Sequence, residues 1–325
     1  MTRQSAGGTA CPTQAKSCSK GVGGAGGFAC NFMNGLAKRM TPRVLASMCA
    51  SLLVLLAALT IAQANPVVIL LIRLISPLIA YGIAMWLCGE IAREYRSSKD
   101  LRRAWVVLGV CAGVSMLRHL FDTPLVDLVW PGYWAGPWSQ LMRELLAAAA
   151  LTLLAAGILT MAEAFRRMRL GFSLHWPDLA AMAGVLLLLA LVLYFRNDLS
   201  AARVSVSLAK RAQLFSQVMF AIAAAGCVLL MRISKQMGGG KLAIAMGWII
   251  AHIVLRAALV LATAWQAHLN KSLPSVNLTF LLLSNAAIWM FAMAAASRYQ
   301  VSVTAAQQAA KWGVVPNGRL ADVAG

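Results

Sequence analysis

Eight long apolar stretches constrain the fold of this chain more than any other feature of its sequence. They cover residues 44–63, 67–88, 104–122, 142–163, 177–195, 213–231, 242–265 and 277–297. A bilayer core about 30 Å thick requires roughly 20 apolar residues of α-helix, so each stretch is long enough to cross it. Membrane barrel strands alternate apolar and polar residues, whereas these stretches are apolar on all sides. The sequence therefore predicts an all-α polytopic membrane helix bundle with eight transmembrane helices.

The composition agrees with this fold and excludes two broad classes of protein. The 325 residues are 60% hydrophobic and only 12% charged, whereas soluble domains contain about 25% charged residues. The formal net charge is +19, but too little polar sequence is present to form the basic surface of a nucleic-acid-binding protein. The lipid bilayer is therefore the expected partner, and no nucleic acid is expected.

The basic residues predict how the helices are oriented in the membrane. Loops on one side of the eight stretches contain 20 Lys and Arg residues, and loops on the other side contain 5. Because positively charged loops stay in the cytoplasm, both termini are expected there, with the chain in an inner (plasma) membrane. The segment 196–212 is the exception, since it holds 4 of the 5 outer bases.

Three regions are expected along the chain. Residues 1–43 form a tail rich in Gly, Ser, Ala and Thr, which buries too little apolar surface to fold. Residues 44–297 form the helix bundle, and residues 298–325 form a short cytoplasmic tail. In an alternative interpretation, translation starts at Met40 and a signal peptide is cleaved after the Ala-Gln-Ala sequence at 62–64. Seven transmembrane helices would then remain.

The chain also contains a weak internal repeat. A shift of 138 residues superposes the first four apolar stretches on the last four, and it aligns Arg73 with Arg211 and Arg118 with Arg256. A repeat of this kind is parallel, with two halves of four helices related by an axis along the membrane normal, as in some transporters. Chance matches are frequent in a sequence with so few residue types, so the 4+4 repeat is a hypothesis.

Ionisable residues inside or at the edges of the stretches define a candidate ligand-binding site. Charges in a bilayer core are costly, usually face the bundle interior and often serve function. The candidate residues are Arg73, Arg118, His119, Arg143, Glu144, His252 and Arg256. At 1.5 Å per residue, Arg256 is about 13 Å from the outer end of its stretch, which is too deep to reach the interface cheaply. His252 lies one turn deeper on the same helix face.

Two interpretations of these residues remain open. Four Arg and two His face only Asp122 and Glu144, so at least two guanidinium groups have no protein carboxylate. Because Arg binds carboxylate and phosphate groups through paired hydrogen bonds, an outward-facing pocket for an anionic small molecule or lipid headgroup is one interpretation. In the other, Arg73, Arg118 and Arg143 extend to the outer interface or hydrogen-bond to helix carbonyls.

The outer segment 123–141 is rich in aromatic residues, among them Trp130, Tyr133, Trp134 and Trp138. Aromatic rings concentrate at membrane interfaces, so an interfacial anchor explains them. The functional alternative is an aromatic lid over an outward-facing cavity.

No catalytic, metal or cofactor motif is present. Ser115 follows a Gly-Val pair, but Met116 replaces the second glycine of an intramembrane serine protease motif. Seven Cys and four His residues show no zinc or haem spacing, so no metal or cofactor is expected. The lack of a catalytic motif disfavours an enzyme but leaves the question open.

Three functions stay open for such a chain. The first is a sensor or binding module for an anionic or amphipathic ligand from the outer side, which signals to a cytoplasmic partner through the basic loop 89–103 and the tails. The second is a transporter or flippase for such a ligand. The third is a membrane scaffold or assembly factor without a ligand.

Overall fold

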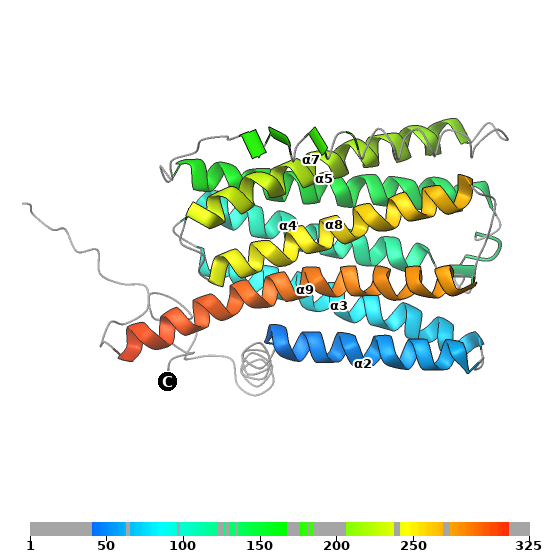
Figure 1. Cartoon of the computed structure of the whole chain (residues 1–325), viewed down its shortest axis with the longest axis horizontal. Coiled ribbons are helices and arrows are strands. Elements are labelled where there is room, and N and C mark those ends of the chain that lie inside the picture. The colour runs from blue at the N-terminus through cyan, green and yellow to red at the C-terminus, as the bar shows by residue number, and fades with distance from the viewer. Residues whose placement is uncertain are drawn as a thin grey trace, which may run out of the picture.

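The described part of the chain folds into a bundle of seven α-helices (Figure 1). This computed structural model describes residues 41–62, 66–95, 98–122, 126–127, 130–133, 136–167, 176–177, 179–180, 183–184, 187, 206–236, 241–268 and 274–311. The helices are α2 (Pro42–Ile61), α3 (Pro66–Glu94), α4 (Lys99–Phe121), α5 (Pro137–Arg167), α7 (Val206–Gln236), α8 (Lys241–His268) and α9 (Pro274–Lys311). The prediction of an all-α fold is confirmed.

Six of these helices contain a segment long and apolar enough to cross a membrane, and α8 adds a shorter apolar segment, Ile244–Leu259. The chain is therefore a multi-pass helical membrane protein. The predicted fifth stretch, 177–195, lies mostly outside the described residues, so the total of eight transmembrane helices stays a prediction. Of the predicted tail over 1–43, residues 1–40 also lie outside them, and α2 begins within its last residues at Pro42. At the other end, α9 continues to Lys311, beyond the predicted limit of the bundle at 297.

Local sequence signals explain where two of the helices begin. The Thr41 hydroxyl accepts a hydrogen bond from the Val44 amide at 3.2 Å, and Pro42 occupies the first turn, where a missing N–H costs nothing. Helix α4 carries Asp100 in its first turn and basic residues in its last turn. These charges match the positive and negative ends of the helix dipole.

Glycines allow close approach between neighbouring helices. A Cβ atom at Gly157 of α5 would lie 2.8 Å from Cδ2 of Leu108 in α4, and one at Gly226 of α7 would lie 2.7 Å from Cγ2 of Ile158 in α5. Helix association in lipid depends on tight packing, because burial from water contributes nothing there. These two glycines therefore hold α5 against both of its neighbours.

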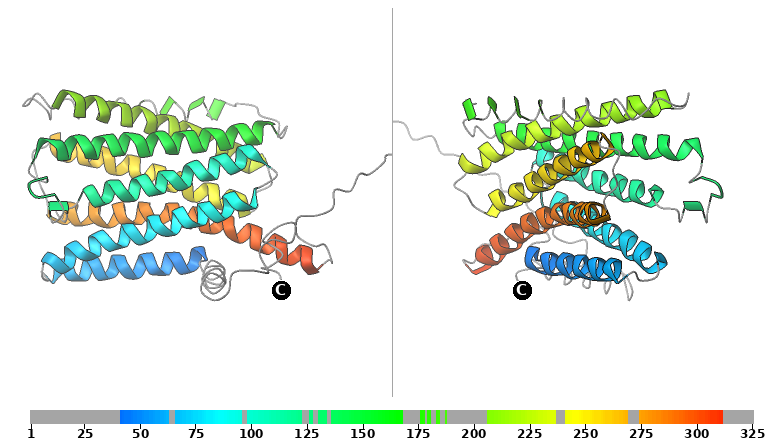
Figure 2. Two further views of the ribbon diagram at one scale, coloured as in Figure 1. Left: turned by 180° about the vertical axis from the view of Figure 1, so that it is seen from behind. Right: turned by 45° about the vertical axis from the view of Figure 1, so that its right-hand side comes forward.

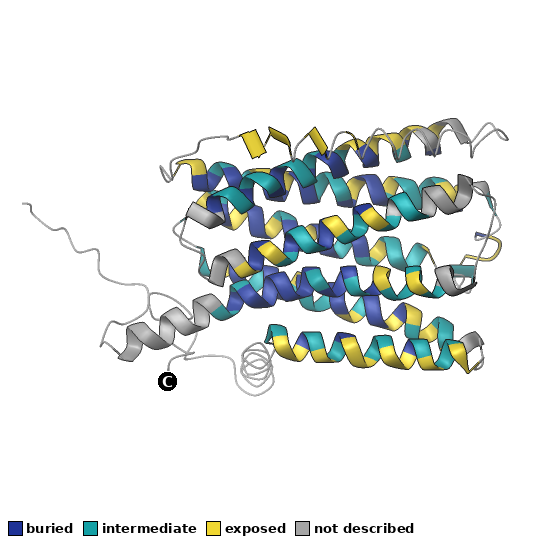
Figure 3. Cartoon of the chain, in the orientation of Figure 1, coloured by how far each residue is buried: buried dark blue, intermediate teal, exposed yellow. Residues whose placement is uncertain are grey.

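The helices form a closed ring. In order, α3, α4, α5, α7, α8 and α9 each pack on the next, and α9 packs back on α3. Helix α2 packs on the outside of the ring against α9 and α3, at one flank of the bundle (Figures 1 and 2). Only Leu45, Cys49 and Leu56 of α2 are buried, whereas buried residues concentrate on the helices of the ring (Figure 3). The core therefore lies inside the ring.

The two ends of the ring differ in composition. Tyr133 and Trp138 lie near the start of α5, at what we call the aromatic end. At the opposite, charged end, Asp100 of α4 is hydrogen-bonded to Arg167 of α5 at 3.0 Å. Helices α4 and α8 both run from the charged end to the aromatic end, so residue numbers on both increase in the same direction (Figure 1).

Candidate functional site

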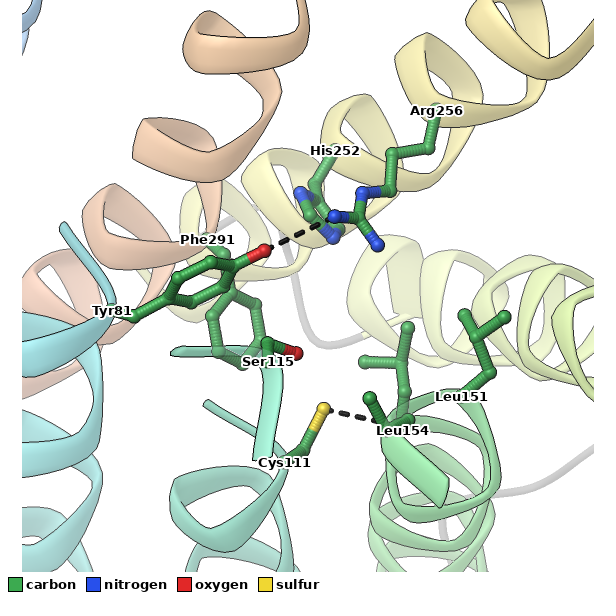
Figure 4. A pocket seen from close by; sticks show the side chains of 9 residues that line it. Tyr81, Cys111, Ser115, Leu151, Leu154, His252, Arg256 and Phe291 are labelled. Atoms are coloured by element: carbon green, nitrogen blue, oxygen red, sulfur yellow. Dashed lines mark hydrogen bonds between the residues drawn. The ribbon is translucent and has the colours of Figure 1, made fainter. Parts of the chain in front are cut away.

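A small cavity lies inside the ring, enclosed by α3, α4, α5, α8 and α9 (Figure 4). It is lined by Tyr81, Cys111, Ser115, Ala150, Leu151, Leu154, His252, Arg256 and Phe291. The centre of a water-sized sphere can occupy about 10 Å³ of it, which is close to the minimum for one water molecule. The wall from α5 is apolar, whereas α3, α4 and α8 contribute polar groups.

Arg256 crosses the cavity from α8 towards α3. Its Nη2 atom donates a hydrogen bond to the Tyr81 hydroxyl at 3.1 Å (Figure 4). Tyr81 is buried and Arg256 is half-buried. A neutral hydroxyl orients the guanidinium without neutralising it, so the positive charge of Arg256 is retained at the cavity wall.

His252 lies one turn from Arg256 on α8 and is only 4% exposed. Its Nδ1 atom is hydrogen-bonded to the Ala287 carbonyl of α9, and its ring centroid is 5.6 Å from that of Phe291. Because a carbonyl oxygen only accepts, Nδ1 carries the proton, and Nε2 of the neutral ring is an acceptor. Helices α8 and α9 are thereby connected beside the cavity.

Arg118 lies on α4, on the same face as Cys111 and Ser115 and nearer the aromatic end. Its Nε atom is buried and has no hydrogen-bond partner. Its charge interacts with the like charge of Arg256 and with the opposite charges of Asp122 and Glu144. None of the ion pairs formed among the described residues includes Arg118 or Arg256.

Asp122 is already engaged by Arg143 at the aromatic end. Arg143 Nη1 and Asp122 Oδ1 are 3.1 Å apart, and Arg143 Nε donates to the Ser139 carbonyl at 3.2 Å. The two charged side chains are 30% and 43% exposed, so solvent screens this pair. Half-buried Glu144 follows Arg143 on α5.

Arg73 and His119, like Arg143 and Glu144, are not among the residues that line the cavity. The Arg73 side chain is exposed, and its backbone carbonyl oxygen is hydrogen-bonded to His119 Nε2 of α4 at 3.3 Å. The structure therefore brings His252 and Arg256 to the cavity, with Arg118 nearby. It does not bring Arg73, His119, Arg143 or Glu144 there.

The aromatic residues divide into exposed and buried ones. Trp130 and Trp138 are 53% and 67% exposed, whereas Tyr133 is 4% exposed and packs edge-on against Phe121. None of the described three lines the cavity, and Trp134 lies outside the described residues. Their placement suits an anchor at the membrane interface, and the lid is not supported by any contact with the cavity lining.

The cavity also contains residues that sequence reasoning missed, namely Tyr81, Cys111 and Phe291. A hydroxyl or thiol within an apolar helix does not stand out as a charge does. One signal was present, because a tyrosine hydroxyl in a bilayer core has to find a hydrogen-bond partner. Cys111 satisfies the same requirement by donating to the Ala150 carbonyl of α5 at 3.2 Å.

These features define a polytopic helical membrane protein with a small cationic cavity inside its helix ring. No protein-family model, curated protein or solved structure matches the chain. Within the described ranges, no three His, Cys, Asp or Glu side chains gather as metal ligands would.

Proposed function

We propose that this protein is a sensor or binding module for a small anionic ligand, which enters from the aromatic end and binds at Arg256. In the proposed topology, eight helices cross an inner membrane, both termini lie in the cytoplasm, and the aromatic end faces outward. One observation carries the proposal: Arg256 borders an internal cavity close to a second guanidinium, and neither forms an ion pair with a described carboxylate.

The energetics of buried charge support this interpretation. Burying an ion costs several kcal/mol even after the surrounding protein relaxes, unless a counter-charge or hydrogen bonds compensate. Tyr81 supplies one hydrogen bond to Arg256, and Asp122 is engaged by Arg143. A bound anion would supply the missing counter-charge at the cavity.

The packing between the cavity and the charged end favours binding over transport. Trp105, Leu108, Met246 and Ile249 fill the ring there, and each is at most 2% exposed. A ligand that enters from the aromatic end meets packed side chains beyond His252. Its binding energy is then available to shift the helices that contact a cytoplasmic partner, as a sensor requires.

A transporter is the second candidate, and the ring itself favours it. Five helices enclose the cavity, and the order of the ring helices is that of two similar halves. Opening towards the charged end would convert the cavity into a pathway for the same anion. Because the ring is closed sideways, a flippase for lipids has less support. A scaffold would leave Arg256 without a role.

The test uses the full chain, purified and reconstituted in nanodiscs. Thermal unfolding is followed with potassium formate, acetate, nitrate, sulfate, phosphate and chloride at constant ionic strength. We expect at least one anion to raise the Tm of the wild type and of Arg73→Gln, which removes an exposed cation, but not of Arg256→Gln. The proposal is wrong if no anion raises the Tm, or if Arg256→Gln responds like the wild type. Uptake of the binding anion into proteoliposomes separates transport from sensing.

A further inference from the structure

We infer that Arg118 and Arg256 are equivalent residues of two four-helix halves, and that they bind one small oxyanion between them near the axis that relates the halves. This inference rests on the proposed function and deepens it, because it names the ligand class and a second cation that binds the ligand.

The packing of the helices is the first support. Helix α3 packs on α4 and α4 on α5, as α7 packs on α8 and α8 on α9. Between the halves, α9 packs on α3 as α5 packs on α7. Exchanging α3 with α7, α4 with α8 and α5 with α9 therefore converts each contact of the ring into another contact of the ring. Figure 1 shows α3 with α9 on one flank, α5 with α7 on the other, and α4 and α8 between them.

The helix bounds follow the same repeat. Adding 138 to the bounds of α4 (Lys99–Phe121) gives 237–259, which overlaps α8 (Lys241–His268). Adding 138 to those of α5 (Pro137–Arg167) gives 275–305, which lies within α9 (Pro274–Lys311). The shift of 138 residues, which the sequence alone supports weakly, therefore also aligns the bounds of helices in the first half with those of helices in the second half.

The inward faces of α4 and α8 are the second support. On α4 the residues Leu108, Cys111 and Ser115 are buried, and their partners 138 positions later are also buried. Those partners are Met246, Ile249 and Ile253. The next position on each face is an arginine, Arg118 or Arg256, and both are half-buried. The two guanidinium groups therefore extend from equivalent positions at the same depth of the ring.

The charges of these two residues are the third support. Arg118 and Arg256 are close enough for their like charges to interact. Two cations inside a ring of low dielectric repel each other, and an anion between them adds two attractions over shorter distances, which outweigh that repulsion. Donors are available on both, because Arg118 Nε is buried without a partner and the hydrogen bond of Arg256 uses Nη2.

The size of the cavity and the chemistry of arginine define the ligand class. Each guanidinium presents a planar fork of donors that matches the oxygens of a carboxylate or an inorganic oxyanion. The free space beside Arg256 is about that of one water molecule, so even a small oxyanion requires the lining side chains to move apart, and a ligand with an acyl chain does not fit. The two halves do not contribute the same polar groups to the cavity wall. The position equivalent to Tyr81 is Met219, and the position equivalent to His252 is Val114, so neither polar side chain is repeated in the other half. The ligand would therefore bind in one orientation.

The experiment is a double-mutant cycle on the reconstituted full chain. Isothermal titration with formate, acetate, nitrate, sulfate, phosphate and chloride is performed on the wild type, Arg118→Gln, Arg256→Gln and the double variant. We expect one anion per chain and at least about a tenfold rise in Kd for each single variant. The double variant should bind more weakly than either single variant, but by less than the product of the two single losses, because residues that contact one ligand are energetically coupled.

Several outcomes of this titration would overturn the inference. They are two anions per chain, an unchanged Kd for Arg118→Gln, losses that multiply in the double variant, or chloride binding as tightly as the best oxyanion. If Arg256→Gln alone abolishes binding, the shared site is wrong and the proposed function stands. Comparing the Kd values of formate and acetate with those of nitrate, sulfate and phosphate distinguishes a carboxylate ligand from an inorganic oxyanion.

A stability measurement separates binding from a structural role. Without an anion, Arg118→Gln removes a like-charge repulsion, so it should raise the Tm while the increase caused by the anion disappears. Arg118→Lys keeps the charge and loses the fork, so its Tm should stay near that of the wild type with a reduced response to the anion. A lowered Tm with an unchanged response in both variants would assign Arg118 a structural role and overturn the inference.

Discussion

Arginines at the charged end and arginines inside the ring have different environments. At the charged end, Arg167 contacts Asp100 and Glu163, each at 3.0 Å, and Arg166 contacts Glu163 at 2.6 Å. The two arginine side chains are more than 60% exposed, so water solvates and screens most of their charge. Inside the ring, Arg256 has the Tyr81 hydroxyl as its hydrogen-bond partner. The same residue type is thus compensated at the end of the bundle and left uncompensated beside the cavity.

The largest expected effect is on Arg256. Replacing Arg256 with Gln should weaken binding of the preferred anion by roughly 30-fold or more, because losing one partner of a buried charged contact costs at least about 2 kcal/mol. The measurement is a titration of the reconstituted chain. Arg167→Gln is the matched control, since it removes an arginine of the charged end, and its Kd should equal that of the wild type. Equal losses in both variants would remove the distinction between the two regions.

The next effect concerns the partner of Arg256. Tyr81→Phe should lower the free energy of unfolding by about 1.5–3 kcal/mol, because it removes a hydrogen bond to a charged group. The loss should shrink when the binding anion is added, since the anion compensates the same guanidinium. Chemical unfolding in detergent with and without the anion measures both quantities.

Tyr133→Phe is the control for this change. The Tyr133 hydroxyl is 3.5 Å from the Ser139 carbonyl, at the limit of a hydrogen bond, so little loss is expected there. A Tyr81→Phe variant as stable as the wild type would show that Arg256 does not depend on this hydroxyl.

The fold class was predictable from the sequence, because the length of an apolar run is enough to predict a membrane-spanning helix. Apolar runs of about 20 residues match the bilayer, so the all-α class follows from composition and length, and six of the described helices are long and apolar enough to cross a membrane. The extension of α9 to Lys311 did not follow. Residues 298–311 are too polar to register as membrane helix, yet they contain neither Gly nor Pro to end it.

The site was predictable only in part, for a different physical reason. Arg256 and His252 stand out because ionisable residues are rare within apolar helices. Sequence could not separate Arg118 from Arg73, since both occur near the outer ends of apolar stretches. Their difference depends on which face of each helix meets a neighbour, and the packing of α3 and α4 in the ring decides that. Tyr81 was missed because an uncharged residue gives a weak signal.

Packing within the ring should produce the third effect. Gly226→Ala places a methyl group 2.7 Å from Cγ2 of the fully buried Ile158, and overpacking of this kind costs about 1–3 kcal/mol. The control is Gly247→Ala on exposed surface of α8, where a Cβ meets nothing within 4 Å. It should be neutral or stabilising, because Ala favours a helix more than Gly does. Equal unfolding free energies for the two variants would mean that α5 and α7 are not held as closely as described.

The smallest effect is expected at the charged end. Arg167→Gln removes contacts to Asp100 and Glu163 that connect α4 with α5, yet its Tm should differ from that of the wild type only at low salt. Exposed ion pairs contribute little to stability, and mobile ions screen what remains. Thermal unfolding at low and high salt tests this. A large loss that persists at high salt would mean that these contacts are shielded from solvent, and the uncompensated charge beside the cavity would then no longer distinguish the ring from the end. A loss that vanishes with salt preserves the contrast with Arg118 and Arg256 inside the ring, for which we propose a bound anion as the counter-charge.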